Sequence, residues 1–141
     1  MKINLLNNLL SDIDNILDIN SGGCCYIAYI IAKYCDLHNI KYSVIFTDYE
    51  DLFSNVDNLI KNRSSKGIFD DSEYSCNHIY LKINNICINK EELEYSYESD
   101  IINSDDLLWI YRNGDWNETY DTANNSIISK FINKICERTL N

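Results

Sequence analysis

The stretch GGCCYIAYIIAKYCDLH, residues 22–38, decides how this chain folds. Between Cys24 and His38 only Lys33 and Asp36 are charged, and most of the other side chains are apolar. A helix that is apolar on most of its sides must be surrounded by protein. The two glycines break the chain ahead of this helix, because glycine adopts backbone angles that other residues avoid. The sequence therefore predicts a central, buried helix that begins at Cys24.

Amphipathic segments are predicted on both sides of the buried helix. Residues 3–19 place leucine and isoleucine at helical spacing, with Asp and Asn between them. Asn39 is suited to end the buried helix in the left-handed conformation. The other predicted elements are a strand at 41–46 and helices at 51–61, 105–112 and 124–140. Together they predict a single α+β domain over residues 1–141, in which the buried helix packs on a small antiparallel sheet between the N- and C-terminal helices.

The clearest local signal is a hairpin, in which Asn84-Asn85 joins the runs HIYLKI and ICIN. Its register predicts which side chains share a face of the sheet, because residues opposite each other point the same way. The first face carries Ile79, Leu81, Ile83, Ile86 and Ile88. The second face carries His78, Tyr80, Lys82, Cys87, Asn89 and Glu91. We expect the first face to be core and the second to serve chemistry or solvent.

Composition narrows the classes of function. The 141 residues are 45% hydrophobic and carry a formal net charge of -10, without a cluster of Lys and Arg that could follow a phosphate backbone. We therefore expect no binding to nucleic acid. The start MKINLLNNLL does not resemble a secretory signal, and no apolar run reaches membrane-spanning length. We expect a cytoplasmic protein without membrane attachment, whose six cysteines are free thiols. The Ile-, Asn- and Lys-rich composition is typical of AT-rich bacteriophage genes, and a phage protein would work in the host cytoplasm.

Cys24, His78 and Asn89 have the residue types of a thiol-nucleophile site. The free N–H groups at a helix start favour a thiolate, and an imidazole can take up its proton. Asn89 lies diagonally across the hairpin from His78 and is predicted to orient its ring, with Glu91, directly opposite His78, as the rival for that role. The oxyanion would be held by the backbone N–H of Cys24 and by a second donor from Asn20 or Ser21.

This arrangement resembles the papain-like (transglutaminase-like) cysteine hydrolase superfamily over residues 20–92, in small phage-type form. The order Cys, His, Asn is the same, and Ala28 follows Cys24 by four residues, as in transglutaminase-like domains, ahead of the turn into Val44 and Ile45. The resemblance implies hydrolysis of an amide bond in a protein or peptide, or acyl transfer, through a thioester on Cys24. It implies no cofactor.

Three alternatives remain open at this point. Asp18 stands where papain-like proteases have an oxyanion-binding glutamine, which favours an interaction protein that keeps the fold without activity. Cys25 is a second candidate for the nucleophile. A zinc site made of Cys76, His78 and Cys87 is disfavoured, because no Cys-x-x-Cys pair is present.

Overall fold

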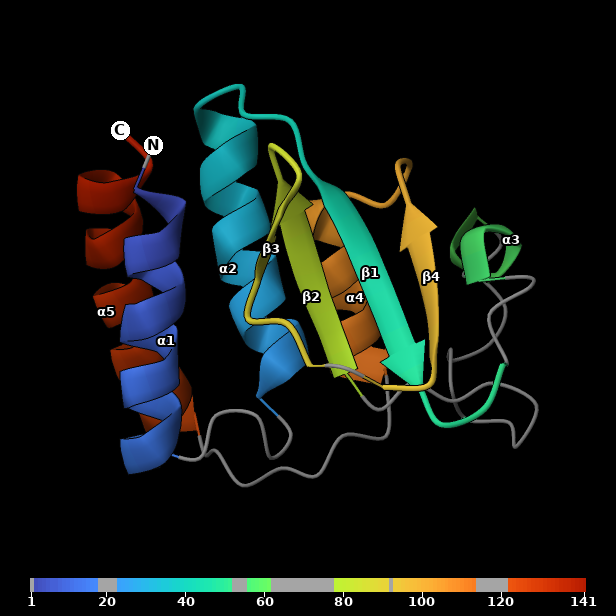
Figure 1. The fold of residues 1–141 in the computed structure, drawn as a ribbon, viewed down its shortest axis with the longest axis horizontal. Helices are drawn as coiled ribbons and strands as arrows, with labels where there is room; N and C mark the ends of the chain where they lie inside the picture. Colours follow the sequence, from blue (N-terminus) through green and yellow to red (C-terminus); the bar gives the residue numbers. More distant parts are fainter. Residues whose placement is uncertain (1, 18–22, 52–55, 62–77, 92, 114–121) are drawn as a thin grey trace.

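The computed structural model of the chain describes residues 2–17, 23–51, 56–61, 78–91, 93–113 and 122–141. Over these residues the protein has five helices and a four-stranded antiparallel sheet, which confirms the predicted α+β class (Figure 1). The helices are α1 (Ile3–Leu17), α2 (Cys24–Leu37), α3 (Val56–Lys61), α4 (Ser104–Asn113) and α5 (Thr122–Thr139). The strands are β1 (Ser43–Asp48), β2 (His78–Ile83), β3 (Ile86–Ile88) and β4 (Tyr95–Ser99).

The sheet has the strand order β3-β2-β1-β4, so β3 and β4 form its two edges. Helices α2 and α4 lie together against one face of the sheet (Figure 1). Helices α1 and α5 pack side by side next to α2, with both chain termini at the same end (Figure 1). The α-helical layer therefore covers one face of the sheet and continues past its β3 edge.

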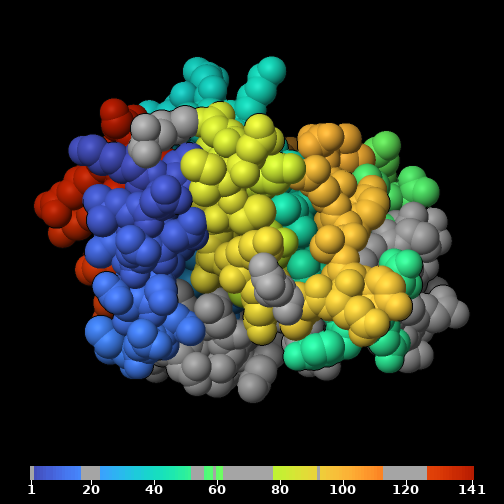
Figure 2. All heavy atoms as spheres, in the orientation of Figure 1, coloured from blue at the N-terminus to red at the C-terminus, as the bar shows by residue number. Residues whose placement is uncertain are grey.

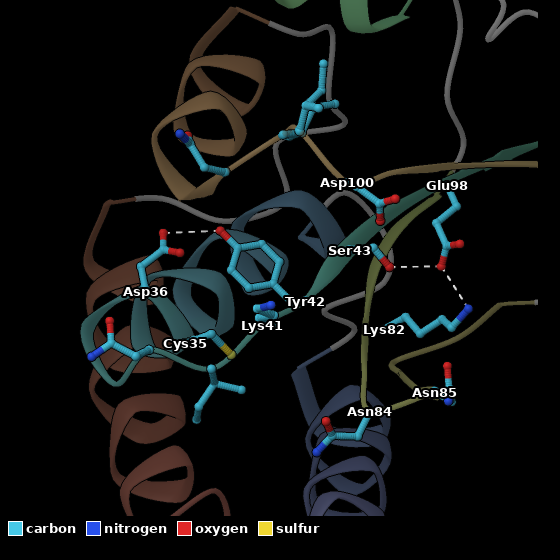
Figure 3. A pocket seen from close by; sticks show the side chains of 15 residues that line it. Cys35, Asp36, Lys41, Tyr42, Ser43, Lys82, Asn84, Asn85, Glu98 and Asp100 are labelled. Carbon is cyan, nitrogen blue, oxygen red and sulfur yellow. Dashed lines mark hydrogen bonds and ion pairs between the residues drawn. The ribbon is translucent and has the colours of Figure 1, made fainter.

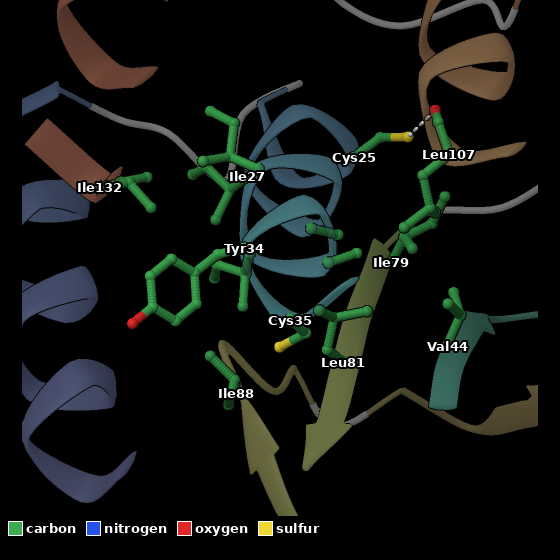
Figure 4. Packing of buried hydrophobic residues seen from close by; sticks show 14 of the residues in the cluster. Cys25, Ile27, Tyr34, Cys35, Val44, Ile79, Leu81, Ile88, Leu107 and Ile132 are labelled. Atoms are coloured by element: carbon green, nitrogen blue, oxygen red, sulfur yellow. Dashed lines mark hydrogen bonds between the residues drawn. The ribbon is translucent and has the colours of Figure 1, made fainter. Parts of the chain in front are cut away.

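Helix α2 is the central helix that its composition predicts. Nine of its fourteen residues are buried, so it is enclosed on most sides. Its apolar side chains meet those of the sheet on one side, where Cys35 lies beside Leu81 and Ile88, and those of α5 on the other, where Ile27 faces Ile132 (Figure 4). Burial of each large aliphatic side chain contributes about 1.5–3 kcal/mol. Asn39 ends the helical segment with φ 56, which confirms the predicted left-handed terminator.

The predicted hairpin register is confirmed. Leu81 pairs with Ile88, and Ile83 pairs with Ile86, across a turn in which Asn84 and Asn85 have φ 52 and 64. Two positive φ angles define the type I′ turn that suits the twist of a hairpin. The strand ends one residue earlier than predicted, however, because Asn89 leaves it in the left-handed region at φ 63.

The strand order forces a long crossing between the two edges. The chain leaves β3 at Ile88 and enters β4 at Tyr95, so it must pass β2 and β1 on the way. It passes at the end of the sheet where β2 begins and β1 ends (Figure 1). The polar face of β2 is consequently covered at this end: His78 is 0% exposed and Tyr80 5%. The hairpin pattern predicts that this face of β2 serves chemistry or solvent. Because His78 is buried, its side chain does not serve as a solvent contact.

Asn7 of α1 closes the free edge of β3. Its side-chain amide donates to the backbone carbonyl of Cys87 at 2.8 Å and accepts from the backbone N–H of Asn89 at 2.7 Å. These are the groups that a neighbouring strand would otherwise bond. The side chains of α1 and of the hairpin meet along this seam on the molecular surface (Figure 2).

Three other boundaries differ from the sequence predictions. The strand predicted at 41–46 lies at Ser43–Asp48, because Tyr42 remains at the end of α2, where its hydroxyl donates to Asp36 at 3.1 Å. Strand β4 was not predicted. The helix predicted at 51–61 is described only from Val56 to Lys61. None of the helices in the described part of the chain has the length and apolarity needed to cross a membrane.

Candidate functional site

Cys24 is the first residue of α2, directly after the N-cap residue Gly23. Its side chain is 1% exposed, and this burial raises the pKa of the thiol to about 11. Hydrogen bonds from the backbone N–H groups of Ile79, Cys25 and Cys24 itself act in the opposite direction and favour the thiolate. The contact with Ile79 matters most for the site, because it brings the sulfur to the residue that follows His78 at the start of β2.

The imidazole of His78 is fully buried; Nε2 makes a hydrogen bond, and Nδ1 lies at ion-pair distance from a carboxylate. Nε2 lies 2.6 Å from the backbone carbonyl oxygen of Asn89. Because a carbonyl oxygen only accepts hydrogen bonds, Nε2 carries the hydrogen. Nδ1 lies 3.3 Å from Oε2 of Glu91, whose side chain is 48% exposed. The ring is therefore held in one orientation, with Nδ1 as the nitrogen that can exchange a proton.

Glu91 connects the imidazole to the thiol electrostatically. Besides facing Nδ1 of His78, its negative charge is close enough to raise the pKa of Cys24, although less than burial does. The hairpin register predicts Glu91 beside His78, and the structure brings the two side chains together.

Asn89 contacts His78 in a different way from the one predicted. The sequence predicts an orienting role for Asn89, and the contact that the structure gives is made by its backbone carbonyl. The left-handed conformation of Asn89 turns this carbonyl away from the β ladder. Asparagine tolerates this conformation better than most residues, so an asparagine after the last apolar residue of β3 was a usable signal for a turn.

The remaining predicted residues have different outcomes. Asn20, Ser21 and Cys76 lie outside the described residues. Cys25, the second candidate for the nucleophile, directs its thiol to α4, where it donates to the carbonyl of Leu107 at 3.5 Å (Figure 4). Within the described ranges, no three His, Cys, Asp or Glu side chains gather in a way that could hold a metal ion.

No protein-family model matches the chain, and neither does a curated protein or a solved structure. Within the described residues, Glu91 lies beside His78, and the backbone N–H of Ile79 bonds the sulfur of Cys24. The papain-like resemblance stays a prediction from the residues.

A separate cavity of about 910 Å³ lies at the other end of α2 and of the sheet (Figure 3). Charged side chains around it are engaged with one another: Nζ of Lys82 and Oγ of Ser43 both lie 2.9 Å from Oε1 of Glu98. Lys82 and Ser43 lower the pKa of the Glu98 carboxyl. No local pattern in the sequence predicts this cavity, because residues from three distant segments line it. None of the residues predicted to act in catalysis is among them.

Proposed function

We propose that this protein is a cysteine hydrolase or acyltransferase with a papain-like (transglutaminase-like) fold, acting on an amide bond in a protein or peptide. The observation that carries the proposal is the contact of Cys24 with the backbone of Ile79 at the start of β2, directly after His78, whose Nε2 is hydrogen-bonded and whose Nδ1 faces Glu91. A thiol at a helix start and an oriented imidazole on the residue before its backbone contact are the parts that an activated nucleophile requires.

The proposed reaction begins with attack of the Cys24 sulfur on the carbonyl carbon. As the S–C bond forms, the thiol proton moves to Nδ1 of His78, while Nε2 keeps its hydrogen and donates it to the carbonyl of Asn89. Glu91 stabilises the resulting imidazolium. The proton then passes to the leaving amine as the C–N bond breaks, which leaves a thioester on Cys24. Water hydrolyses the thioester, or a second amine takes the acyl group, and the thiol is restored.

The site has to open before a substrate can react. A carbonyl carbon cannot approach a sulfur whose side chain is 1% exposed, beside an imidazole that is 0% exposed. The connection between β3 and β4 supplies the groups that contact the ring, so its displacement would uncover His78. The raised pKa of Cys24 keeps the resting thiol protonated, which suits a nucleophile that becomes active only on opening.

The second candidate is a non-catalytic interaction protein that retains the fold, for example one encoded by a phage and directed at its host. The observation that favours it is the same complete burial, because a buried cysteine and a buried histidine whose Nε2 is hydrogen-bonded also suit a structural role. The two candidates differ in whether Cys24 ever reacts with a carbonyl in the native protein.

Acylation by p-nitrophenyl acetate tests the proposal without knowledge of the natural substrate. We expect release of nitrophenolate and an acetyl thioester on Cys24, located by mass spectrometry of the quenched protein. The His78→Ala variant should acylate about 10²–10⁴-fold more slowly, the range that general-base catalysis contributes. His38→Ala is the matched control, because His38 is exposed at the far end of α2. Protection of the buried Cys35 from labelling reports that each variant is folded.

Acetylation confined to Cys87, or equal acetylation of Cys24 in the wild type and in His78→Ala, would overturn the enzymatic proposal. Cys87 is half-buried on β3 and serves as the internal measure of ordinary thiol reactivity. Either result would leave the interaction protein as the better account.

A further inference from the structure

The geometry points to Asn7 as a positioning residue of the site: we infer that it determines which nitrogen of His78 carries the hydrogen. Asn7 lies on α1, far from His78 in the sequence, and it acts through the backbone of Asn89. A role of Asn7 in catalysis rests on the proposed function, whereas its effect on the tautomer of the His78 imidazole does not.

Three short hydrogen bonds link Asn7 to the imidazole. The Asn7 amide accepts from the N–H of Asn89 at 2.7 Å and donates to the carbonyl of Cys87 at 2.8 Å. The carbonyl of Asn89 in turn accepts from Nε2 of His78 at 2.6 Å. The Asn7 side chain therefore fixes the backbone between Cys87 and Asn89. The carbonyl of Asn89, which follows directly, accepts the hydrogen bond from Nε2 of the imidazole.

The backbone of Asn89 needs such support because it is left-handed, with φ 63. The left-handed region is less stable than the right-handed regions for residues other than glycine, so surrounding contacts must maintain it. Without Asn7, the N–H of Asn89 and the carbonyl of Cys87 lose the partner that fixes them at the edge of β3. Asn89 can then rotate, and its carbonyl leaves Nε2.

Loss of this carbonyl would change the form of the neutral imidazole. With Asn89 in place, the hydrogen is on Nε2 and the lone pair is on Nδ1, the nitrogen that takes the Cys24 proton in the proposed reaction. With Asn89 displaced, the carboxylate of Glu91, 3.3 Å from Nδ1, is the remaining acceptor beside the ring. The hydrogen then moves to Nδ1, and the nitrogen that faces Glu91 ceases to be a base.

A small hollow of about 290 Å³ adjoins Asn7 on the seam between α1 and β3, where Ser11, Asp14 and Lys90 also line it. Water can enter a polar hollow of this size and bond the backbone groups that Asn7 releases. The Asn7→Ala variant is therefore expected to fold, and its effect to be confined to the end of β3.

The ¹⁵N resonances of the imidazole nitrogens test the inference directly, at about pH 9, above the ordinary histidine pKa of about 6.5. In the wild type we expect the Nε2–H form of His78. In Asn7→Ala we expect the Nδ1–H form or a mixture of both. Asn8→Ala is the matched control, because Asn8 is exposed on the same helix, and His38 is an internal reference in every sample.

A His78 ring that stays in the Nε2–H form in Asn7→Ala overturns the inference, as does an equal change in Asn8→Ala. If Asn7→Ala does not fold, the ¹⁵N resonances of His78 in Asn7→Ser replace it as the test. The serine hydroxyl is too short to reach both the N–H of Asn89 and the carbonyl of Cys87. The acylation rate of Cys24 separates this inference from the proposed function. If Asn7→Ala changes the tautomer of His78 but Cys24 is acylated in none of the proteins, the inference about Asn7 stands and the proposed enzymatic function is wrong.

Discussion

Raising the pH from about 8 to about 10 should destabilise the fold by about 4 kcal/mol, because three buried thiols ionise freely only in the unfolded chain. Burial raises the pKa of Cys24 from 9.0 to about 11, and burial raises those of Cys35 and Cys136 from 9.0 to about 12. The contribution of the protonated thiols to the free energy of unfolding is complete below the unfolded-state pKa of 9.0. It is lost progressively as the pH rises from there through the folded-state values of about 11 and about 12. At about pH 10 each thiol accounts for about 1.4 kcal/mol of the loss, since each pKa unit corresponds to that amount.

Urea unfolding under reducing conditions at the two pH values measures this loss. The free energy of unfolding of the Cys35→Ala variant should fall by about 1.4 kcal/mol less between them, because this variant has two thiols of raised pKa in place of three. Comparison with the variant removes the contribution of the tyrosines, which is common to both proteins. Cys87→Ala is the control, since that thiol is already partly accessible. A wild-type stability that is equal at both values, or a Cys35→Ala variant with the full loss, would refute the assignment of these thiols as buried and protonated.

Three further substitutions have definite expected outcomes. Glu91→Gln removes a negative charge that raises the pKa of Cys24, so thiolate absorbance should appear at lower pH; an unchanged titration argues against their proximity. Asn89→Gly should keep the wild-type stability in urea, whereas Asn89→Val should lose about 1–2 kcal/mol, because valine resists φ 63; equal losses contradict the left-handed assignment. Asp57→Asn should speed hydrogen exchange in β4 by weakening the bond from Tyr97, and unchanged exchange means that α3 does not hold this edge.

Much of the fold follows from local signals in the sequence. The apolar run after Gly23 predicts α2, and Asn84-Asn85 predicts both the hairpin and its register. Strand β4 was missed for a physical reason: it is a largely exposed edge strand, whose alternation of Tyr95 and Tyr97 with polar residues carries little hydrophobic signal. Its pairing with β1 depends on the crossing connection, and no local pattern encodes that.

The candidate site was predictable in part. The hairpin register places Glu91 near His78, and the structure pairs them. Chain order could not show that Cys24 would meet Ile79, because that contact depends on how α2 docks on the sheet. It also could not show that Asn7 would bond the end of β3, since a side chain at a strand edge leaves no pattern in either segment.

The central claim is that the Cys24 thiol and the His78 imidazole work as a pair. The rate at which iodoacetamide alkylates Cys24, followed by mass spectrometry from about pH 5 to about pH 10 in the wild type and in His78→Ala, tests it most directly. We expect Cys24 to react faster in the wild type than in His78→Ala at every pH below the thiol pKa of about 11, because the imidazole takes up the thiol proton when the site opens. An isolated buried thiol would behave otherwise. If both proteins react at equal rates that rise about tenfold per pH unit toward the thiol pKa of about 11, the claim is contradicted.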